Sequence, residues 1–256
     1  MTEPLRHTTS ELLAILSARQ LKEGQVVFAG VGIPLLAATL AQRLRCPGLT
    51  ILFEGGVVGA FVEPGKLPPS TNDQRCTKRA NMVLGSADVL LLLQRGYVDI
   101  GFMGGAQIDQ FGNLNSSFIG DPEKPKTRLP GTGGGNDISS LANMIVAMKH
   151  EKRRFVEKVD FITSPGFLRG GQSRAEGGLP SGGMFRVVTE LAVFCFEDEL
   201  RRMKVMALNP GVTRDQVQDN TGFELLFDDD LSVTEPPTEQ ELSTLRLLDP
   251  QKLFTA

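Results

Sequence analysis

The chain has 256 residues, of which 41% are hydrophobic and 22% are charged, and its formal net charge is −3. This length and composition allow a substantial buried core, whereas the slight acidity and scattered charge argue against nucleic acid and membrane surfaces as primary partners. No apolar stretch reaches the ~20 residues that a membrane-spanning helix needs, and the N-terminal residues do not resemble a signal or transit peptide.

The first part of the chain predicts a helix followed by a strand–helix–strand unit. Thr8-x-x-Glu11 is a capping box, which indicates the start of an amphipathic helix. We expect a buried strand at 26–31, a helix at 34–45 that has proline at its first position, and a strand at 50–54. Two strands joined by a helix predict parallel pairing with a right-handed crossover.

The rest of the chain predicts a long loop, two helices and further strands. Residues 59–80 contain several prolines and predict a long loop, a kind of segment that is often functional in compact domains. Helices are expected at 87–96 and after the capping box Thr238-x-x-Glu241. Strands are expected at 98–104, 144–148, 159–163, 185–190, 192–197 and 204–209. Because 185–197 resembles a hairpin, we predict a single α/β domain over residues 1–256, with an open, mostly parallel sheet, flanking helices and some antiparallel strands.

Cysteine and histidine are scarce. The cysteines Cys46, Cys76 and Cys195 are odd in number and far apart, which suits a reduced cytoplasm and provides no metal motif. The two histidines are too few for a His-rich metal site, and they argue against a Ser-His-Asp triad. His150 lies in the charged run KHEKRR, so we expect it to be solvated rather than to act as a catalytic base.

Glu54 is unusually placed for a carboxylate. It ends an apolar run and precedes Gly55 and Gly56, which would let a substrate approach closely. In open α/β sheets, ligands bind just beyond the carboxyl ends of strands. A helix N-cap or a surface ion pair would also explain a single glutamate, so both alternatives stay open from the residues alone.

Four glycine-containing loops follow expected strands. Gly30 and Gly32 begin a dinucleotide-like fingerprint that lacks its third glycine; they would serve either as a tight turn or as an anion contact at the following helix. Gly105, Ala106 and Gln107 would either line an oxyanion hole or form ordinary turns. The run Gly133, Gly134 and Gly135 is not a Walker loop, and residues 170–183 suit a mobile surface loop.

Taken in order, these segments resemble the β-type subunit of class I coenzyme A transferases, and most closely the glutaconate CoA-transferase type. The resemblance spans almost the whole chain and is carried by the segments 30–37, 51–56, 102–117, 119–137, 150–155, 163–166 and 220–225. It implies a CoA-transferase/NagB-like fold and identifies Glu54 as the nucleophile. The usual Asn or Ser after that glutamate is replaced here by Gly55.

The resemblance also implies the remaining parts of the site and its partners. Gly105, Ala106 and Gln107 would form the oxyanion site, whereas Gly30, Gly32 and the run Gly133, Gly134 and Gly135 would face coenzyme A. The chain would act in the cytoplasm with an α-type partner subunit, in a hetero-oligomer such as α2β2 or α4β4, without a permanently bound cofactor or metal. Its substrates would be an acyl-CoA thioester and a small carboxylic acid such as glutaconate.

Two other functions remain compatible with the same fold. The chain could belong to a CoA-ester hydrolase or decarboxylase, although the presence of Glu54 favours transfer. It could also be a non-catalytic subunit that binds CoA ligands or supports its partner. CoA exchange by the purified complex separates these alternatives.

Overall fold

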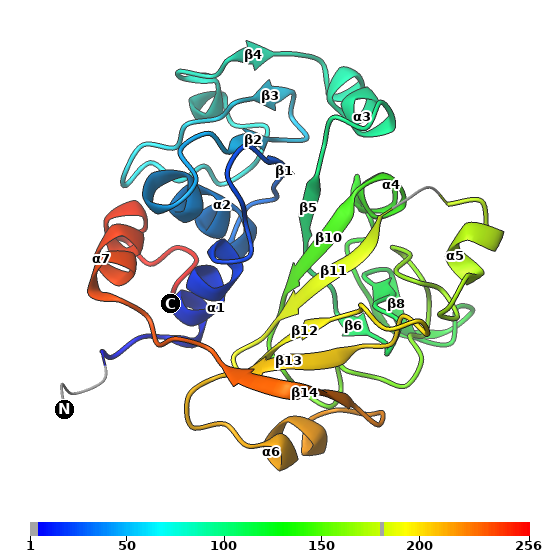
Figure 1. Ribbon diagram of the computed structural model, residues 1–256. Coiled ribbons are helices and arrows are strands. Elements are labelled where there is room, and N and C mark those ends of the chain that lie inside the picture. Colours follow the sequence, from blue (N-terminus) through cyan, green and yellow to red (C-terminus); the bar gives the residue numbers. More distant parts are fainter. Residues whose placement is uncertain (1–4, 180–181) are drawn as a thin grey trace. The chain divides into compact units, whose positions relative to one another are not determined.

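The computed structural model describes residues 5–179 and 182–256, and the chain forms two compact units (Figure 1). Unit 1 contains the chain up to Met103 together with the C-terminal segment Pro236–Ala256, and unit 2 contains Gly104–Glu235. The single domain over residues 1–256 stays a prediction. Each unit combines strands with helices, which confirms the α/β class with parallel strands, flanking helices and some antiparallel pairs.

The strands of unit 1 lie in the order β5-β1-β2-β3-β4. Strand β1 pairs in parallel with both β2 and β5, while β3 is antiparallel to β2 and β4. Their bounds are β1 Val26–Phe28, β2 Thr50–Leu52, β3 Val57–Val58, β4 Met82–Val83 and β5 Ile100–Met103. The expected strand–helix–strand unit is therefore confirmed, with shorter strands than the apolar runs predict.

The helices of unit 1 include both elements expected from capping boxes. Thr8 caps α1 and Thr238 caps α7, each with the reciprocal hydrogen bonds of a capping box. Figure 1 shows α1, α2 and α7 side by side, and ion pairs Arg19–Glu241 and Arg246–Glu11 join α7 to α1. The helical bounds are α1 Thr9–Ala18, α2 Ile33–Leu44, the 3₁₀ helix η1 Gln74–Thr77, α3 Ser86–Gln94 and α7 Glu239–Leu248.

Unit 2 has a second set of strands in the order β10-β11-β12-β13-β14. The outer pairs β10/β11 and β13/β14 are parallel, while the inner pairs are antiparallel, as the predicted hairpin requires. The bounds are β10 Asn143–Ala147, β11 Gly183–Val188, β12 Ala192–Cys195, β13 Lys204–Leu208 and β14 Leu226–Val233.

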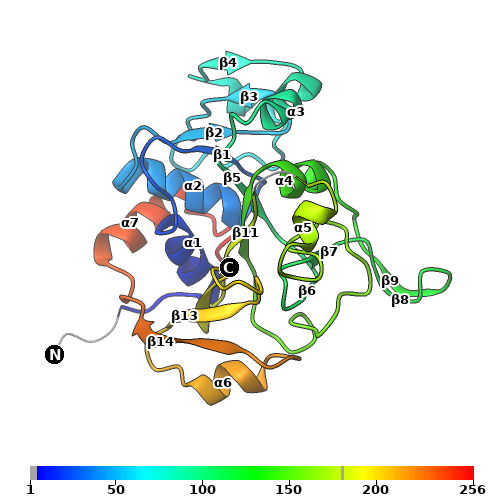
Figure 2. The same cartoon turned by 45° about the vertical axis from the view of Figure 1, so that its right-hand side comes forward.

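Smaller elements complete unit 2. Two antiparallel pairs, β6/β7 and β8/β9, precede β10, and Figure 2 shows β8 and β9 extending from the unit as a hairpin. Three short helices accompany the strands in the described part of this unit. The bounds are β6 Gln107–Ile108, β7 Leu114–Asn115, β8 Phe118–Gly120, β9 Pro125–Arg128, α4 Gly135–Leu141, α5 Ser173–Glu176 and α6 Arg214–Asp219.

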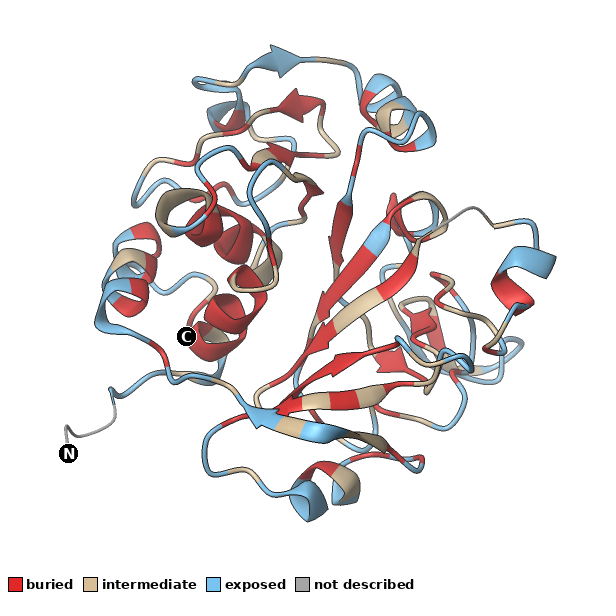
Figure 3. Ribbon diagram, in the orientation of Figure 1, coloured by how far each residue is buried: buried red, intermediate tan, exposed pale blue. Residues whose placement is uncertain are grey.

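Each unit has its own hydrophobic core (Figure 3). In unit 1 most of the largest fully buried side chains come from α1, α2 and the strand β2, with Phe53 continuing the core beyond the end of that strand, and α3 and α7 also contribute fully buried leucines. In unit 2 the largest are Phe155, Phe194 and Phe196. The three cysteines are unpaired and buried within these cores. The apolar runs read from the sequence thus supply the buried layers, as burial of apolar area requires.

The prediction of a strand at 159–163 is wrong, because the structure has no strand there. Val159 is buried there, but Phe161 and Ile162 are both exposed. Asp160 accepts hydrogen bonds from the Gln107 side chain and from the Gly120 N–H, and the Thr163 N–H donates to the Leu114 carbonyl, but these contacts do not form a continuous strand ladder. The apolar residues that suggested a strand are therefore only partly buried in this segment.

Candidate functional site

Glu54 lies in the turn between β2 and β3, two residues beyond the end of β2, and is partly buried. The turn is closed by two main-chain hydrogen bonds, from Phe53 N to Val57 O at 2.9 Å and from Gly56 N to Phe53 O at 3.0 Å. The fully buried Phe53 ring anchors it to the core. The structure therefore presents a single carboxylate at the carboxyl end of a core strand.

The two glycines after Glu54 are required by close packing. A Cβ on Gly55 would lie 2.5 Å from both the Thr71 carbonyl oxygen and Asn72 Oδ1. Gly56 has φ +106°, and a Cβ there would collide with the Leu84 carbonyl oxygen. The main chain of residues 71–72 and 84 thus occupies the space that side chains at 55 and 56 would need.

Gly30 and Gly32 lie at the same end of the strands as Glu54. They follow β1, which pairs in parallel with β2 in the register Phe28↔Leu52, so the carboxyl ends of both strands meet at one edge. Gly32 is the N-cap residue of α2 and has no side-chain capping bond. The first N–H groups of α2, which have no acceptor within the helix, therefore lie beside the carboxyl end of β1. They belong to unit 1, the unit that contains Glu54.

The Gly105-Ala106-Gln107 segment belongs to unit 2, where most of its polar groups are already hydrogen-bonded. The Ala106 N–H donates to the Asn115 carbonyl at 2.8 Å. The buried Gln107 carboxamide donates to Asp160 Oδ2 at 3.1 Å and accepts from Asn115 Nδ2 at 2.7 Å. Within residues 5–179 and 182–256, the Gly105 N–H has no acceptor.

The glycine run at 133–135 leads into α4 instead of forming an extended loop. Gly133 has φ +51°, and Gly134 is the N-cap residue of the helix. The Gly135 N–H donates to the Thr132 carbonyl at 2.8 Å. The last glycine loop, 170–183, includes α5, and its residues 180–181 lie outside the described part of the chain. The predicted site residues are thus divided between unit 1, with Glu54, Gly30 and Gly32, and unit 2, with the rest.

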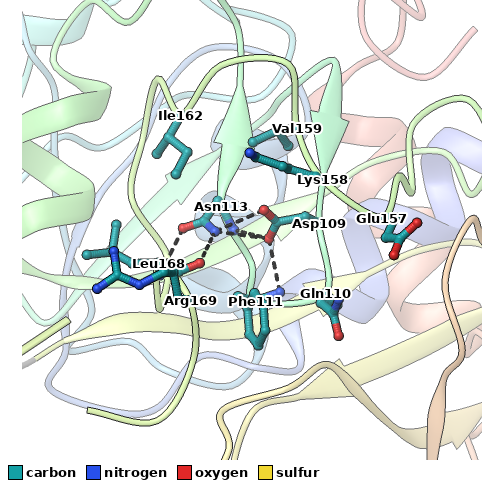
Figure 4. Close-up of a pocket in the computed structure, with 10 residues that line it drawn as sticks. All are labelled: Asp109, Gln110, Phe111, Asn113, Glu157, Lys158, Val159, Ile162, Leu168 and Arg169. Atoms are coloured by element: carbon teal, nitrogen blue, oxygen red, sulfur yellow. Dashed lines mark hydrogen bonds between the residues drawn. The ribbon is translucent and has the colours of Figure 1, made fainter. Parts of the chain in front are cut away.

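A cavity of about 670 Å³ in unit 2 was not predicted from the sequence (Figure 4). Its walls are mainly apolar, and Lys158 and Arg169 also line it. Asp109 and Asn113 lie against it and are hydrogen-bonded to each other, with Asn113 Nδ2 at 2.9 Å from Asp109 Oδ2. Burial raises the pKa of Asp109, and the hydrogen bonds from Asn113 and the Phe111 N–H oppose that shift. The Asp-x-x-Gly-Asn pattern at 109–113 signals the turn but not the cavity.

The expectation that His150 is solvated is wrong, because its ring is buried in unit 2. The ring stacks on Phe155 with centroids 4.0 Å apart. Its nitrogens lie 3.2 Å from Thr189 Oγ1 and 3.0 Å from Thr221 Oγ1. Burial lowers the pKa of His150 to about 3. The charged neighbours in KHEKRR suggested exposure, but the chain turns His150 inward between residues distant in the sequence.

The burial of His150 predicts acid sensitivity. Because an unfolded histidine has a pKa of about 6.5, the unfolded chain binds a proton at His150 that the folded chain does not. This contribution to stability is complete above about pH 6.5 and is lost as the pH falls toward 3, by on the order of 3 kcal/mol between pH 7 and pH 4. Urea unfolding at several pH values should show this loss reduced in His150→Phe, which keeps the stacked ring. An unchanged pH dependence in that variant would contradict the assignment.

Neither a metal centre nor a membrane span is found in the described residues. Across residues 5–179 and 182–256, no cluster of three or more His, Cys, Asp or Glu side chains is placed to hold a metal ion. None of the helices described is long and apolar enough to cross a bilayer.

Comparisons with known proteins identify the same family as the sequence motifs. A family model described as Coenzyme A transferase matches residues 11–220. The chain is 40% identical over 245 residues to the B subunit of 3-oxoadipate CoA-transferase from Pseudomonas knackmussii, covering 95% of this chain and 94% of that protein. It is 38% identical over 231 residues to the B subunit of glutaconate CoA-transferase from Acidaminococcus fermentans, covering 88% and 86%. The crystal structure of glutaconate coenzyme A-transferase from Acidaminococcus fermentans matches with a TM-score of 0.92 at 35% identity and covers 99% of both chains. These matches confirm the resemblance, and the chain belongs to the coenzyme A transferase family.

Proposed function

We propose that this protein is the β-type subunit of a CoA-transferase that moves CoA between an acyl-CoA and a small dicarboxylic acid such as glutaconate. The observation that carries the proposal is the position of Glu54, a partly buried carboxylate in a glycine turn at the end of a core strand. The names of the similar proteins support the reaction class and two acids, glutaconate and 3-oxoadipate.

In the proposed reaction, a Glu54 oxygen attacks the carbonyl carbon of the acyl-CoA thioester. The C–S bond breaks, CoA leaves as a thiolate, and an acyl–glutamyl anhydride remains. The thiolate then attacks the glutamyl carbonyl carbon, releasing the donor acid and leaving a thioester between Glu54 and CoA. The acceptor carboxylate repeats these steps in reverse order, which restores the Glu54 carboxylate. Protons and electrons balance without a metal or a redox cofactor, and the kinetics are ping-pong.

In this proposal, the other predicted site residues stabilise the oxyanion or contact coenzyme A. Gly105, Ala106 and Gln107 form the oxyanion segment, with the Gly105 N–H as its available donor because the other two residues bond within unit 2. Removing one such donor typically lowers the rate about 10²–10³-fold. Gly30, Gly32, Gly133, Gly134 and Gly135 would let coenzyme A approach the main chain, since glycine has no side chain to exclude it.

The proposal includes an α-type partner, because the similar proteins are B subunits of their enzymes. We expect this chain alone to show no CoA transfer, and the complex co-expressed with its partner to be active. The measurement is transfer of CoA from acetyl-CoA or succinyl-CoA to glutaconate, 3-oxoadipate and acetate, followed by chromatography of the CoA esters.

Release of free CoA or CO₂ without any requirement for an acceptor acid would contradict transfer and favour a hydrolase or decarboxylase. Full transfer activity of the isolated chain would contradict the partner requirement. A complex that binds acyl-CoA without converting it would favour a non-catalytic subunit.

A further inference from the structure

The turn that carries Glu54 packs directly against the side chain of Asn72, eighteen residues further along the chain. A Cβ built on Gly55 would lie 2.5 Å from Asn72 Oδ1 and 2.9 Å from Asn72 Cα. The Asn72 carboxamide therefore fills the place of a side chain at position 55. Gly55 directly follows Glu54, so this carboxamide packs beside the residue next to the Glu54 carboxylate.

The segment around Asn72 is held in place by its own hydrogen bonds. The Asn72 N–H donates to Ser70 Oγ at 3.2 Å, and the Asp73 N–H donates to the Ser70 carbonyl at 3.1 Å. Asp73 then caps the short helix η1 by accepting from the Arg75 N–H at 2.9 Å. The buried Cys76 anchors that helix. The turn at 70–73 thus presents Asn72 in a defined position, at little entropic cost on substrate binding.

The Asn72 carboxamide is able to form further hydrogen bonds. The residue is exposed, and in the part of the chain that the structure describes its side chain makes no hydrogen bond. A carboxamide offers two N–H donors, which suit a carboxylate oxygen or the carbonyl oxygen of a thioester. By contrast, Gly55 and Gly56 can offer Glu54 no side chain at all.

We propose that Asn72 is a positioning residue that donates a hydrogen bond to the Glu54 side chain, first to its carboxylate and then to the carbonyl oxygen of its CoA thioester. The inference rests on the proposed function of Glu54. A single rotamer of the carboxylate would be favoured for attack, because the glycine turn itself leaves the side chain free to rotate. Loss of such positioning lowers turnover more than substrate affinity, since misplacement by about 1 Å can reduce the rate about 10²-fold.

The test uses three substitutions at Asn72 in the complex with the α-type partner. Asn72→Ala should lower kcat about 10- to 100-fold with little change in KM. Asn72→Asp keeps the shape against Gly55 but removes the N–H donor, so its kcat should be no higher than that of Asn72→Ala. Asn72→Ser retains a hydroxyl donor and should recover part of the rate. Mass spectrometry after rapid mixing with acyl-CoA should show slower formation of the Glu54–CoA adduct in the Ala and Asp variants.

Asn81 provides a matched control at the other end of the β2–β3 hairpin. Its carboxamide packs against Gly59 in the same manner, with a Cβ there lying 2.6 Å from Asn81 Cγ. Asn81→Ala should keep both the wild-type kcat and the wild-type rate of adduct formation. If Asn72→Asp or Asn72→Ala forms the adduct as fast as the wild type, the positioning role is wrong. If the wild type forms no adduct on Glu54, the proposed function itself fails, which distinguishes the two outcomes.

Discussion

Replacing Glu54 by glutamine in the complex should abolish immediate CoA transfer, with a loss on the order of 10³-fold or more. The carboxamide has nearly the same shape but lacks the negatively charged oxygen that attacks the thioester. Because the turn at 53–57 is closed by main-chain hydrogen bonds, the substitution should leave it intact. The loss should therefore appear in kcat and not in thermal stability.

The covalent intermediate provides a direct measurement. Incubation of the wild type with acyl-CoA should add the mass of CoA less one water to the peptide that contains Glu54, and borohydride should inactivate the enzyme only after this incubation. Glu54→Gln should show neither effect. Glu63→Gln is a suitable control, because that surface carboxylate pairs with Lys66 and Lys78. Full immediate activity of Glu54→Gln, or an adduct on another residue, would overturn the nucleophile assignment.

Replacing Asn113 by alanine should destabilise unit 2 by about 3–5 kcal/mol, the largest stability effect we expect from one substitution. Asn113 is 1% exposed, and its carboxamide oxygen accepts from the N–H groups of Gly166 and Leu168. Its Nδ2 donates to Asp109 and to the Leu168 carbonyl (Figure 4). Alanine would leave these groups buried with fewer partners, including a carboxylate already desolvated.

Urea unfolding at pH 7 is the appropriate measurement, with Asn220→Ala as the control. Asn220 is exposed, and its carboxamide donates to the Gln216 carbonyl, so its loss should cost less than about 1 kcal/mol. The walls of the cavity include Asn113 and Leu168, so Asn113→Ala should also make these walls less rigid. A midpoint shift for Asn113→Ala no larger than that of the control would show that the network does not stabilise unit 2.

Elements with strong local signals were predictable from the sequence. The helices α1 and α7 each carry a complete capping box, and the proline near the start of α2 and the apolar runs of β1 and β2 are equally local. The two-residue strands β3 and β4 were missed because their pairing depends on the fold around Gly56 and Val58. The strand β14 was also missed, because its sequence LFDDDLSV places three aspartates where β-propensity is low.

The sequence by itself determined the family, the capped helices and the candidate nucleophile Glu54, because each depends on residues adjacent in the chain or on motifs in a fixed order. Only the tertiary structure decided that Asn72 fills the space beside Gly55, that Asn113 organises the turn at 109–113, and that His150 is buried. The physical reason is common to all three. Burial and hydrogen bonding are set by which distant segments pack together, and neither composition nor spacing specifies those contacts.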